Sequence, residues 1–164
     1  MSGELGRYDD ARQMHERALA LQQKALGPEH PEIANTLNNL GNALRELGRF
    51  AEAREQYTRA LALQEKVLPP EHLDHAEILL GMGRLGLEEH RPADALPFLE
   101  RALKLAPEGL RAETRILLAP ALWETRKNRP RAREPATQAR EDWSQQGRKA
   151  DAEPSSRWLA EHAP

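Results

Sequence analysis

The segment LGRFAEAREQYTRALALQEKVLPPEH (residues 47–72) decides the fold, because it repeats LGRYDDARQMHERALALQQKALGPEH (residues 5–30). The second copy begins 42 residues after the first and keeps the pairs Leu5/Leu47, Gly6/Gly48, Ala11/Ala53, Ala18/Ala60, Lys24/Lys66 and His30/His72. A fainter third copy, EHRPADALPFLERALKL (residues 89–105), continues the period. A fourth is indicated by LLAPALWETRKNRPRA (residues 117–132), which pairs with residues 79–94 at an offset of 38. Copies in register identify a repeat protein.

Each period contains two helical segments. In PEIANTLNNLGNALRELG (residues 31–48) the apolar residues recur at spacings of three and four, which predicts an amphipathic helix. A second stripe runs from Phe50 to Leu68 and stops at Pro69 and Pro70. Neither helix can bury its stripe alone, so the pattern predicts antiparallel helix pairs stacked into an all-α solenoid.

The composition agrees with this fold class. Hydrophobic residues make up 39% of the 164 residues, charged residues 30% and aromatic residues 4%. There is no cysteine, which excludes disulfides and thiolate metal sites. The N-terminal sequence has no apolar signal segment, and the longest apolar stretch, ILLAPALW, is far shorter than the roughly 20 residues that span a bilayer. We expect a cytoplasmic protein.

The repeat resembles the tetratricopeptide repeat (TPR). The residues that carry the resemblance are Leu37, Leu40, Gly41, Leu44, Gly48, Phe50, Ala53, Tyr57 and Ala60. Leucine replaces the usual aromatic residues of the first helix, and the 42-residue period exceeds the usual one of about 34. This longer type is similar to the repeats of kinesin light chain. The chain resembles more loosely the C-terminal repeat tails of bacterial serine/threonine kinases.

The resemblance covers residues 5–107 and implies a right-handed solenoid of about three repeats plus a closing helix. We expect a TPR array over residues 1–109, whose first repeat lacks its first helix. The unpaired face of Tyr8, Ala11, Ala18 and Leu19 would then be exposed, which suggests a fragment of a longer array and a route to self-association.

Residues 110–164 are expected to form a degenerate fourth repeat and a capping helix. Pro120, Pro135 and Pro154 interrupt helical patterns there, and an interior proline costs up to about 3 kcal/mol. We expect Trp158 and Leu159 to pack on the preceding helix.

The TPR resemblance also implies a binding face. In that family the first helices line a concave groove, where asparagines hydrogen-bond the backbone of an extended peptide. The matching positions in the second and third copies are Asn35, Asn38, Asn42, Arg45, Glu77, Leu80, Arg84 and Leu87. Arg45 and Arg84 suit an acidic group, and Leu80 and Leu87 an apolar side chain. The alternative is a solvated helix face.

A second motif, LLGMGRLG (residues 79–86), matches the dinucleotide-binding fingerprint G-x-G-x-x-G. That motif must follow a β-strand, and EHLDHAEILL (residues 71–80) has helical spacing instead. Gly83 aligns with Gly41, the small position where two helices cross. Gly81 and Gly86 have no such counterpart, so we expect each to weaken its helix by roughly 0.8–1 kcal/mol and alanine to stabilise it.

The remaining candidates carry weaker patterns. The basic run RKNRPRAR (residues 126–133) suits nucleic-acid phosphates, or a solvated turn. His72 and His75 lack a third metal ligand nearby, and the aligned His30 and His72 fit a capping or loop role. No nucleophile–base set and no kinase signature is present, so we expect no catalytic, cofactor or metal site.

These observations favour a protein–protein interaction module that binds a peptide or partner protein as part of a larger protein. Two alternatives remain open: a regulatory tail of a bacterial kinase, and nucleic-acid binding through residues 126–133.

Overall fold

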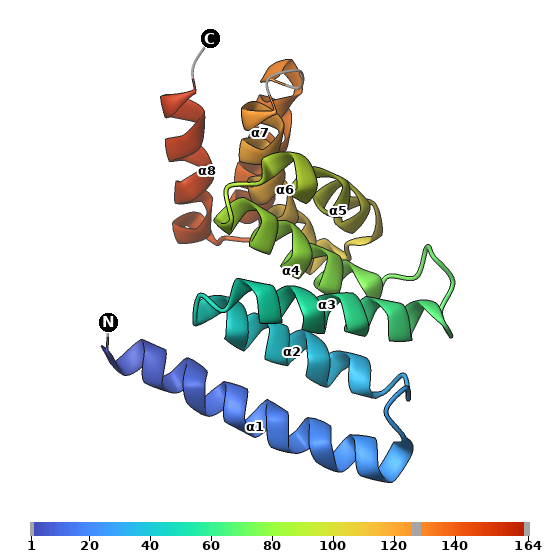
Figure 1. Cartoon of the computed structure of the whole chain (residues 1–164). Coiled ribbons are helices and arrows are strands. Elements are labelled where there is room, and N and C mark those ends of the chain that lie inside the picture. The colour runs from blue at the N-terminus through green and yellow to red at the C-terminus, as the bar shows by residue number, and fades with distance from the viewer. Residues whose placement is uncertain (1, 126–128, 163–164) are drawn as a thin grey trace.

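The structure, a computed structural model, describes residues 2–125 and 129–162. These residues form eight α-helices and no β-strand, which confirms the all-α fold class. The helices are α1 (Ser2–Leu26), α2 (Ile33–Glu46), α3 (Phe50–Glu65), α4 (His75–Glu88), α5 (Pro92–Leu105), α6 (Glu108–Glu124), α7 (Arg129–Gln145) and α8 (Lys149–Glu161) (Figure 1).

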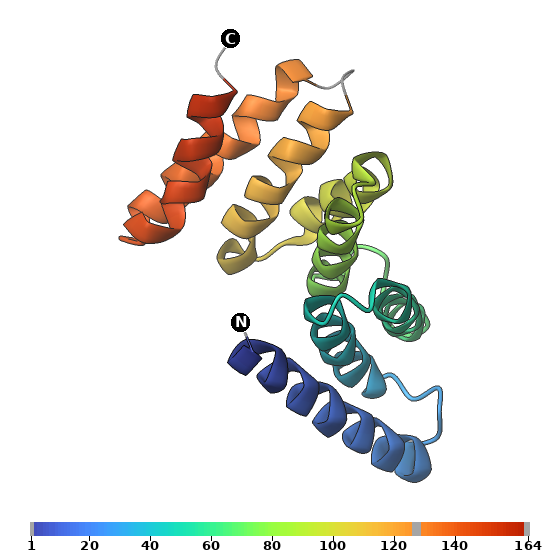
Figure 2. The same cartoon turned by 60° about the vertical axis from the view of Figure 1, so that its left-hand side comes forward.

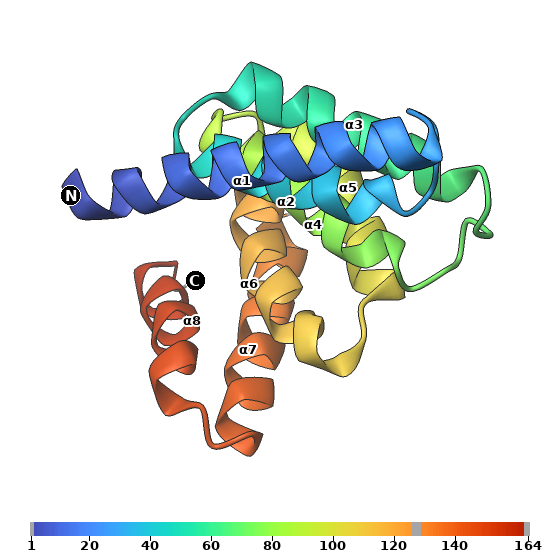
Figure 3. The same ribbon diagram turned by 90° about the horizontal axis from the view of Figure 1, so that it is seen from below.

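Consecutive helices pack as antiparallel neighbours. The pairs α2–α3, α4–α5 and α6–α7 form hairpins, while α1 lies against α2 and α8 against α7. Figure 2 shows the helices following one another along a curve, with α1 at one end and α8 at the other. Seen from below, α6, α7 and α8 run steeply across α1, so the stack twists along its length (Figure 3). This is the predicted solenoid of helix pairs.

Two apolar clusters form the larger part of the core. One joins α2 and α3 to α4 around Leu37 and Tyr57. The other joins α4 and α5 to α6 around Leu99 and Leu122. Each cluster includes one repeat and the first helix of the next, so the burial of every apolar stripe depends on a neighbouring repeat.

One turn geometry recurs at three helix junctions. Gly48, His90 and Gly147 adopt positive φ angles of 72°, 58° and 72°. At each junction the following backbone N–H donates to a carbonyl of the preceding helix: Arg49 N to Leu44 O at 2.9 Å, Arg91 N to Gly86 O at 2.8 Å, and Arg148 N to Trp143 O at 2.8 Å. Such left-handed residues end helices, and glycine adopts this conformation without a Cβ penalty.

The loops before α2 and α4 are held by matching contacts. The Nδ1 atoms of His30 and His72 accept the backbone N–H of Glu32 and Asp74, each at 3.3 Å, which confirms the loop role of the two histidines. The first loop is also held by Arg59 of α3, which donates to Pro28 O at 2.8 Å, and by Lys66 at the end of α3, which lies 2.6 Å from Glu29. The second is held in the same way from α5, by Arg101 to Pro70 O at 3.2 Å and by Lys104 to Glu71 at 2.9 Å.

The prolines of the last third do not interrupt their helices as the sequence suggested. Pro120, Pro135 and Pro154 lie inside α6, α7 and α8, each of which continues through its proline. Packing holds the helices together despite the missing N–H donors. Leu159 is buried with Ala119 and Ala136, as expected, and Trp158 meets Trp123 edge-on at 5.9 Å between ring centroids.

The expectation that Gly81 and Gly86 only weaken α4 is wrong. A Cβ atom at Gly81 would lie 2.8 Å from Cε1 of the fully buried Tyr57. At Gly86 it would lie 2.9 Å from Cβ and 3.2 Å from the backbone N of Ala95. Both glycines therefore allow α4 to approach its neighbours closely, as Gly83 does against Leu99.

Candidate functional site

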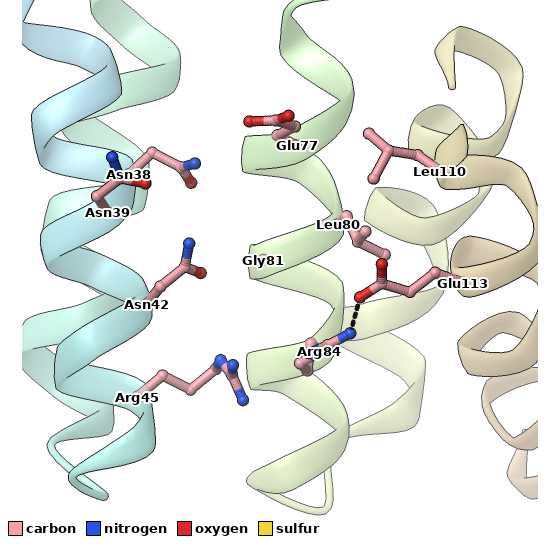
Figure 4. Close-up of a pocket in the computed structure, with 10 residues that line it drawn as sticks. All are labelled: Asn38, Asn39, Asn42, Arg45, Glu77, Leu80, Gly81, Arg84, Leu110 and Glu113. Carbon is pink, nitrogen blue, oxygen red and sulfur yellow. Dashed lines mark hydrogen bonds and ion pairs between the residues drawn. The ribbon is translucent and has the colours of Figure 1, made fainter. Parts of the chain in front are cut away.

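Two adjoining hollows lie on the face formed by the first helices of successive repeats. The central hollow, of about 290 Å³, is lined by Asn38, Asn39, Asn42, Arg45, Glu77, Leu80, Gly81, Arg84, Leu110 and Glu113 (Figure 4). The acidic hollow, of about 230 Å³, is lined by Asn35, Leu73, Asp74, Glu77, Pro107 and Leu110. Glu77 and Leu110 belong to both, so the two hollows form one continuous groove between α2, α4 and α6.

The structure brings most of the predicted groove residues together. The central hollow contains Asn38, Asn42, Arg45, Glu77, Leu80 and Arg84. Asn35 lines the acidic hollow instead. Leu87 lines neither of them, because its side chain is partly buried against the core cluster of α4, α5 and α6. An apolar contact from Leu87 to a ligand is therefore not supported.

The two groove arginines are already paired with carboxylates of this chain. Arg45, whose side chain is only 7% exposed, contacts Glu46 at 2.5 Å and also pairs with Glu88. Arg84 pairs with Glu113 of α6. These contacts neutralise the two charges that the sequence suggested for an acidic ligand group.

Asn42 has a partner inside the fold. The hydroxyl of Tyr57 donates to its side-chain oxygen at 2.7 Å. Burial raises the pKa of the Tyr57 hydroxyl above its ordinary value, although the nearby Arg45 guanidinium opposes this shift. The phenol thus stays a neutral donor, and one lone pair of the Asn42 oxygen is committed to it.

Asn38 differs from Asn42. It is 6% exposed, and its side-chain oxygen has no hydrogen-bond partner among the described residues. Figure 4 shows its amide pointing from α2 toward Glu77 on α4. A buried acceptor without a partner costs about 1–3 kcal/mol, so a ligand N–H at this position would be stabilising.

Sequence reasoning missed four residues of the central hollow: Asn39, Gly81, Leu110 and Glu113. Leu110 and Glu113 come from the first turns of α6, and the offset of 38 aligns the fourth copy with the third only from residue 117 onward. No repeat position pointed to them. Asn39 could have been predicted as a groove residue, since it stands next to Asn38 on the same helix and is exposed.

The structure describes only part of the basic run, because Arg126, Lys127 and Asn128 lie outside the described residues. Its three described arginines contact this chain. The Arg129 guanidinium lies 5.1 Å from the Trp123 ring centroid, Arg131 lies 3.8 Å from Glu100, and Arg133 donates to Leu159 O at 3.1 Å.

The part of the chain that the structure describes contains no cluster of three or more histidine, cysteine or acidic residues able to hold a metal ion. His75 is fully buried, and its ring nitrogens lie 3.0 Å from Gln64 Oε1 and Pro69 O. Within the same residues, no helix has the length and apolar character needed to cross a membrane.

A second candidate surface lies on α1. Leu21 and Leu63 occupy the same repeat position, yet Leu21 is 70% exposed and Leu63 only 4%. Ala60 on α3 is fully buried, whereas its counterpart Ala18 on α1 is only partly buried. In α3 this face packs against α2. In α1 the expected exposure of Ala11, Ala18 and Leu19 is wrong in part: all three are half-buried, and Leu19 packs against the core cluster of α2 and α3, while Tyr8, Met14 and Leu21 stay exposed.

The chain is similar to several solved structures of helical repeat proteins. BtubC (BKLC) from P. vanneervenii aligns with a TM-score of 0.75 and 21% identity over 87% of this chain; the chain spans 59% of that protein's length. A putative kinesin light chain from Podosopora anserina, with nearly identical TPR-like repeats, aligns with a TM-score of 0.71 and 21% identity over 96% of this chain and 82% of its own. PilF from Pseudomonas aeruginosa gives a TM-score of 0.53 at 18% identity, covering 91% and 75%. No curated protein matches the chain.

The sequence model of the tetratricopeptide repeat matches residues 3–66 and 33–108, which together make up more than half of the chain. These matches include α2 and α4 of the groove and end at the first residue of α6. The fold is similar to that of the putative kinesin light chain, and the chain belongs to the tetratricopeptide-repeat family.

Proposed function

We propose that this chain binds an extended peptide segment of a partner protein in the groove between α2, α4 and α6, and that it catalyses no reaction on it. TPR arrays are in general protein–protein interaction modules. The observation that carries the proposal for this chain is the amide of Asn38, which lines the central hollow and whose buried oxygen has no hydrogen-bond partner among the described residues.

An extended peptide suits the polar lining of the groove. Its backbone presents N–H and C=O groups in alternation, and an amide side chain can both donate and accept. Asn35, Asn38 and Asn39 stand on one helix within this groove and include both exposed and buried amides. Leu80 and Leu110 supply apolar surface between them.

The test uses peptides selected from a random dodecapeptide display library against the whole chain. Fluorescence polarisation then measures the dissociation constant of each labelled peptide for two variants. Asn39→Trp fills the groove from an exposed position on α2 and should weaken binding at least about tenfold, or 1.4 kcal/mol. Thr58→Trp, at an exposed position of α3, is the matched control and should leave the dissociation constant unchanged.

Equal affinities of both variants for every selected peptide would contradict the proposal. Far-UV circular dichroism and thermal melts of the two variants establish that neither substitution unfolds the array.

We also propose that the open face of α1 pairs with a second copy of the chain. Leu21 and Met14 are 70% and 69% exposed and lie two helical turns apart, on one side of α1. An apolar helix face that lacks a neighbour in a repeat array gains stability when another helix covers it.

Analytical ultracentrifugation tests this self-association. Leu21→Glu should shift the chain toward monomer, because it places a charge on the face that would be buried. Val67→Glu is the control: Val67 is also exposed, at 58%, but lies beyond α3. A monomeric wild-type chain at high concentration would contradict the proposal.

We propose that residues 1–109 form the array proper and residues 110–164 its degenerate end, and that the protein is cytoplasmic. The kinase-tail alternative has no specific support here. Nucleic-acid binding through residues 126–133 stays an alternative; the three described arginines of the basic run contact this chain.

A further inference from the structure

The acidic hollow combines two carboxylates with apolar walls. Asp74 and Glu77 lie one helical turn apart at the start of α4. Leu73, Pro107 and Leu110 complete the lining together with Asn35. Leu73 is 56% exposed, an unusual position for a large apolar side chain next to two charges.

Neither carboxylate pairs with a lysine or an arginine in the described part of the chain. Glu77 has no hydrogen bond or ion pair there. Asp74 Oδ2 lies 3.6 Å from Nδ1 of His72, a nitrogen that accepts the backbone N–H of Asp74 at 3.3 Å. The groove arginines do not compensate, because Glu88 and Glu113 hold Arg45 and Arg84.

We infer that the acidic hollow binds a lysine or arginine side chain of the peptide that occupies the groove. This inference rests on the proposed function. The aliphatic stem of a basic residue would lie along Leu73, Pro107 and Leu110, as such stems commonly lie on apolar surfaces, while the cationic end meets Asp74 and Glu77. An acidic side chain at this position would meet like charge at close range, so the groove rejects it.

The position of Glu77 links this contact to the peptide backbone. Glu77 lines both hollows, and Figure 4 shows the Asn38 amide directed toward it across the central hollow. A peptide backbone group that binds the Asn38 amide would therefore lie close to the entrance of the acidic hollow. The two contacts together select an extended segment that carries a basic side chain.

The experiment uses the peptides that respond to Asn39→Trp. Each lysine or arginine of the tightest peptide is replaced in turn by norleucine, which keeps an apolar stem and removes the charge. One such replacement should weaken binding about tenfold. The double variant Asp74→Asn/Glu77→Gln should weaken the parent peptide by a similar factor and leave the norleucine peptide unchanged. Glu55→Gln, which removes one exposed carboxylate on α3, is the control for loss of a surface charge outside the groove.

The outcomes separate the two proposals. Peptides that depend on the groove but favour acidic residues, or bind the double variant as well as wild type, overturn the basic-side-chain inference and leave groove binding intact. If no selected peptide responds to Asn39→Trp, both proposals fail. Thermal melts of the double variant show whether any loss reflects unfolding.

Discussion

His90 adopts a backbone conformation that its repeat position reserves for glycine. Its φ is 58°, and Gly48, 42 residues earlier, has a φ of 72° at the corresponding junction. The same hydrogen bond closes both turns, from Arg49 to Leu44 and from Arg91 to Gly86. The turn geometry therefore prevails over the preference of histidine, at a cost of about 1 kcal/mol.

Replacing His90 with glycine should remove this strain. We expect His90→Gly to raise the free energy of unfolding by up to about 1 kcal/mol, less the greater chain entropy of glycine in the unfolded state. Urea denaturation followed by circular dichroism measures the change. His90→Ala keeps the Cβ atom and should give no gain; equal stabilisation by both variants would contradict the explanation.

The glycines of α4 should respond in the opposite way to alanine. Gly81→Ala and Gly86→Ala each place a methyl group within 3 Å of Tyr57 or Ala95, and overpacking of this kind costs about 1–3 kcal/mol. Thermal denaturation should show a lower melting temperature for both. Gly6→Ala in α1, where nothing lies within 4 Å, is the control and should raise it. A rise for Gly81→Ala would mean that Tyr57 moves aside freely.

The role of Gly81 illustrates what the repeat pattern leaves out. Gly41 and Gly83 recur at the same position, so their packing role was predictable from the alignment alone. Gly81 aligns with Asn39 and packs on Tyr57 of the preceding repeat. That contact depends on how two repeats stack. No other repeat of this chain has glycine at the position of Gly81, so the repeat alignment could not predict it.

At the scale of elements, α1 and α3 have similar sequences and different surroundings. Both present the stripe of the repeat's second helix. In α3 that stripe lies against α2 of its own repeat, whereas α1 contacts α2 only as the neighbouring repeat. Burial therefore differs at identical residues, and with it the expected cost of substitution.

Matched leucines test this difference. Leu63→Ala should destabilise the chain by about 2–5 kcal/mol, because it opens a cavity in the core. Leu21→Ala, at the equivalent exposed position, should change the stability of the monomer by no more than about 0.5 kcal/mol. Chemical denaturation at low protein concentration compares the two. A large loss for Leu21→Ala would show that the α1 face is covered in solution.

Helix boundaries were predictable in the first two thirds and less so in the last. The segments expected around residues 31–48 and 50–68 correspond to α2 and α3. In α6, α7 and α8 the prolines suggested breaks that do not occur. The helix propensity of proline predicted these breaks. The helices continue because the burial of Pro135, Ala136 and Leu159 offsets the cost of the proline.

At the scale of the whole molecule, stability should vary along the stack. Each helix pair contacts mainly its sequence neighbours, so local opening is expected to begin at the ends. The α8 end is held by small buried residues, Ala119, Ala136, Ala152 and Ser155, together with Leu159.

Removal of α8 tests this dependence on neighbours. Truncation after Gly147 should increase amide hydrogen exchange in α7 and α6, which lose a covering helix, while α2 and α3 keep their protection. Exchange measured by mass spectrometry gives the profile along the chain. A uniform increase over all helices would show that the array unfolds as one cooperative unit.

The sequence predicted most of the residues that line the groove, but not the ion pairs that neutralise its arginines. The face of Asn38, Arg45 and Arg84 followed from the family pattern. Their charge balance depends on Glu88, which occupies the repeat position of Glu46, and on Glu113 of α6, which lies before the aligned part of the fourth copy. These contacts, between non-equivalent repeat positions, are the reason that we infer a basic rather than an acidic ligand group.

The central claim is that a peptide occupies the groove between α2, α4 and α6, and amide chemical-shift mapping tests it most directly. The ¹⁵N-labelled chain is titrated with the tightest selected peptide. The account predicts the largest shifts at Asn38, Asn39 and Glu77, with Glu55 and Thr58 on α3 unchanged. Shifts concentrated on α3 and α5, with those groove amides unmoved, would contradict it.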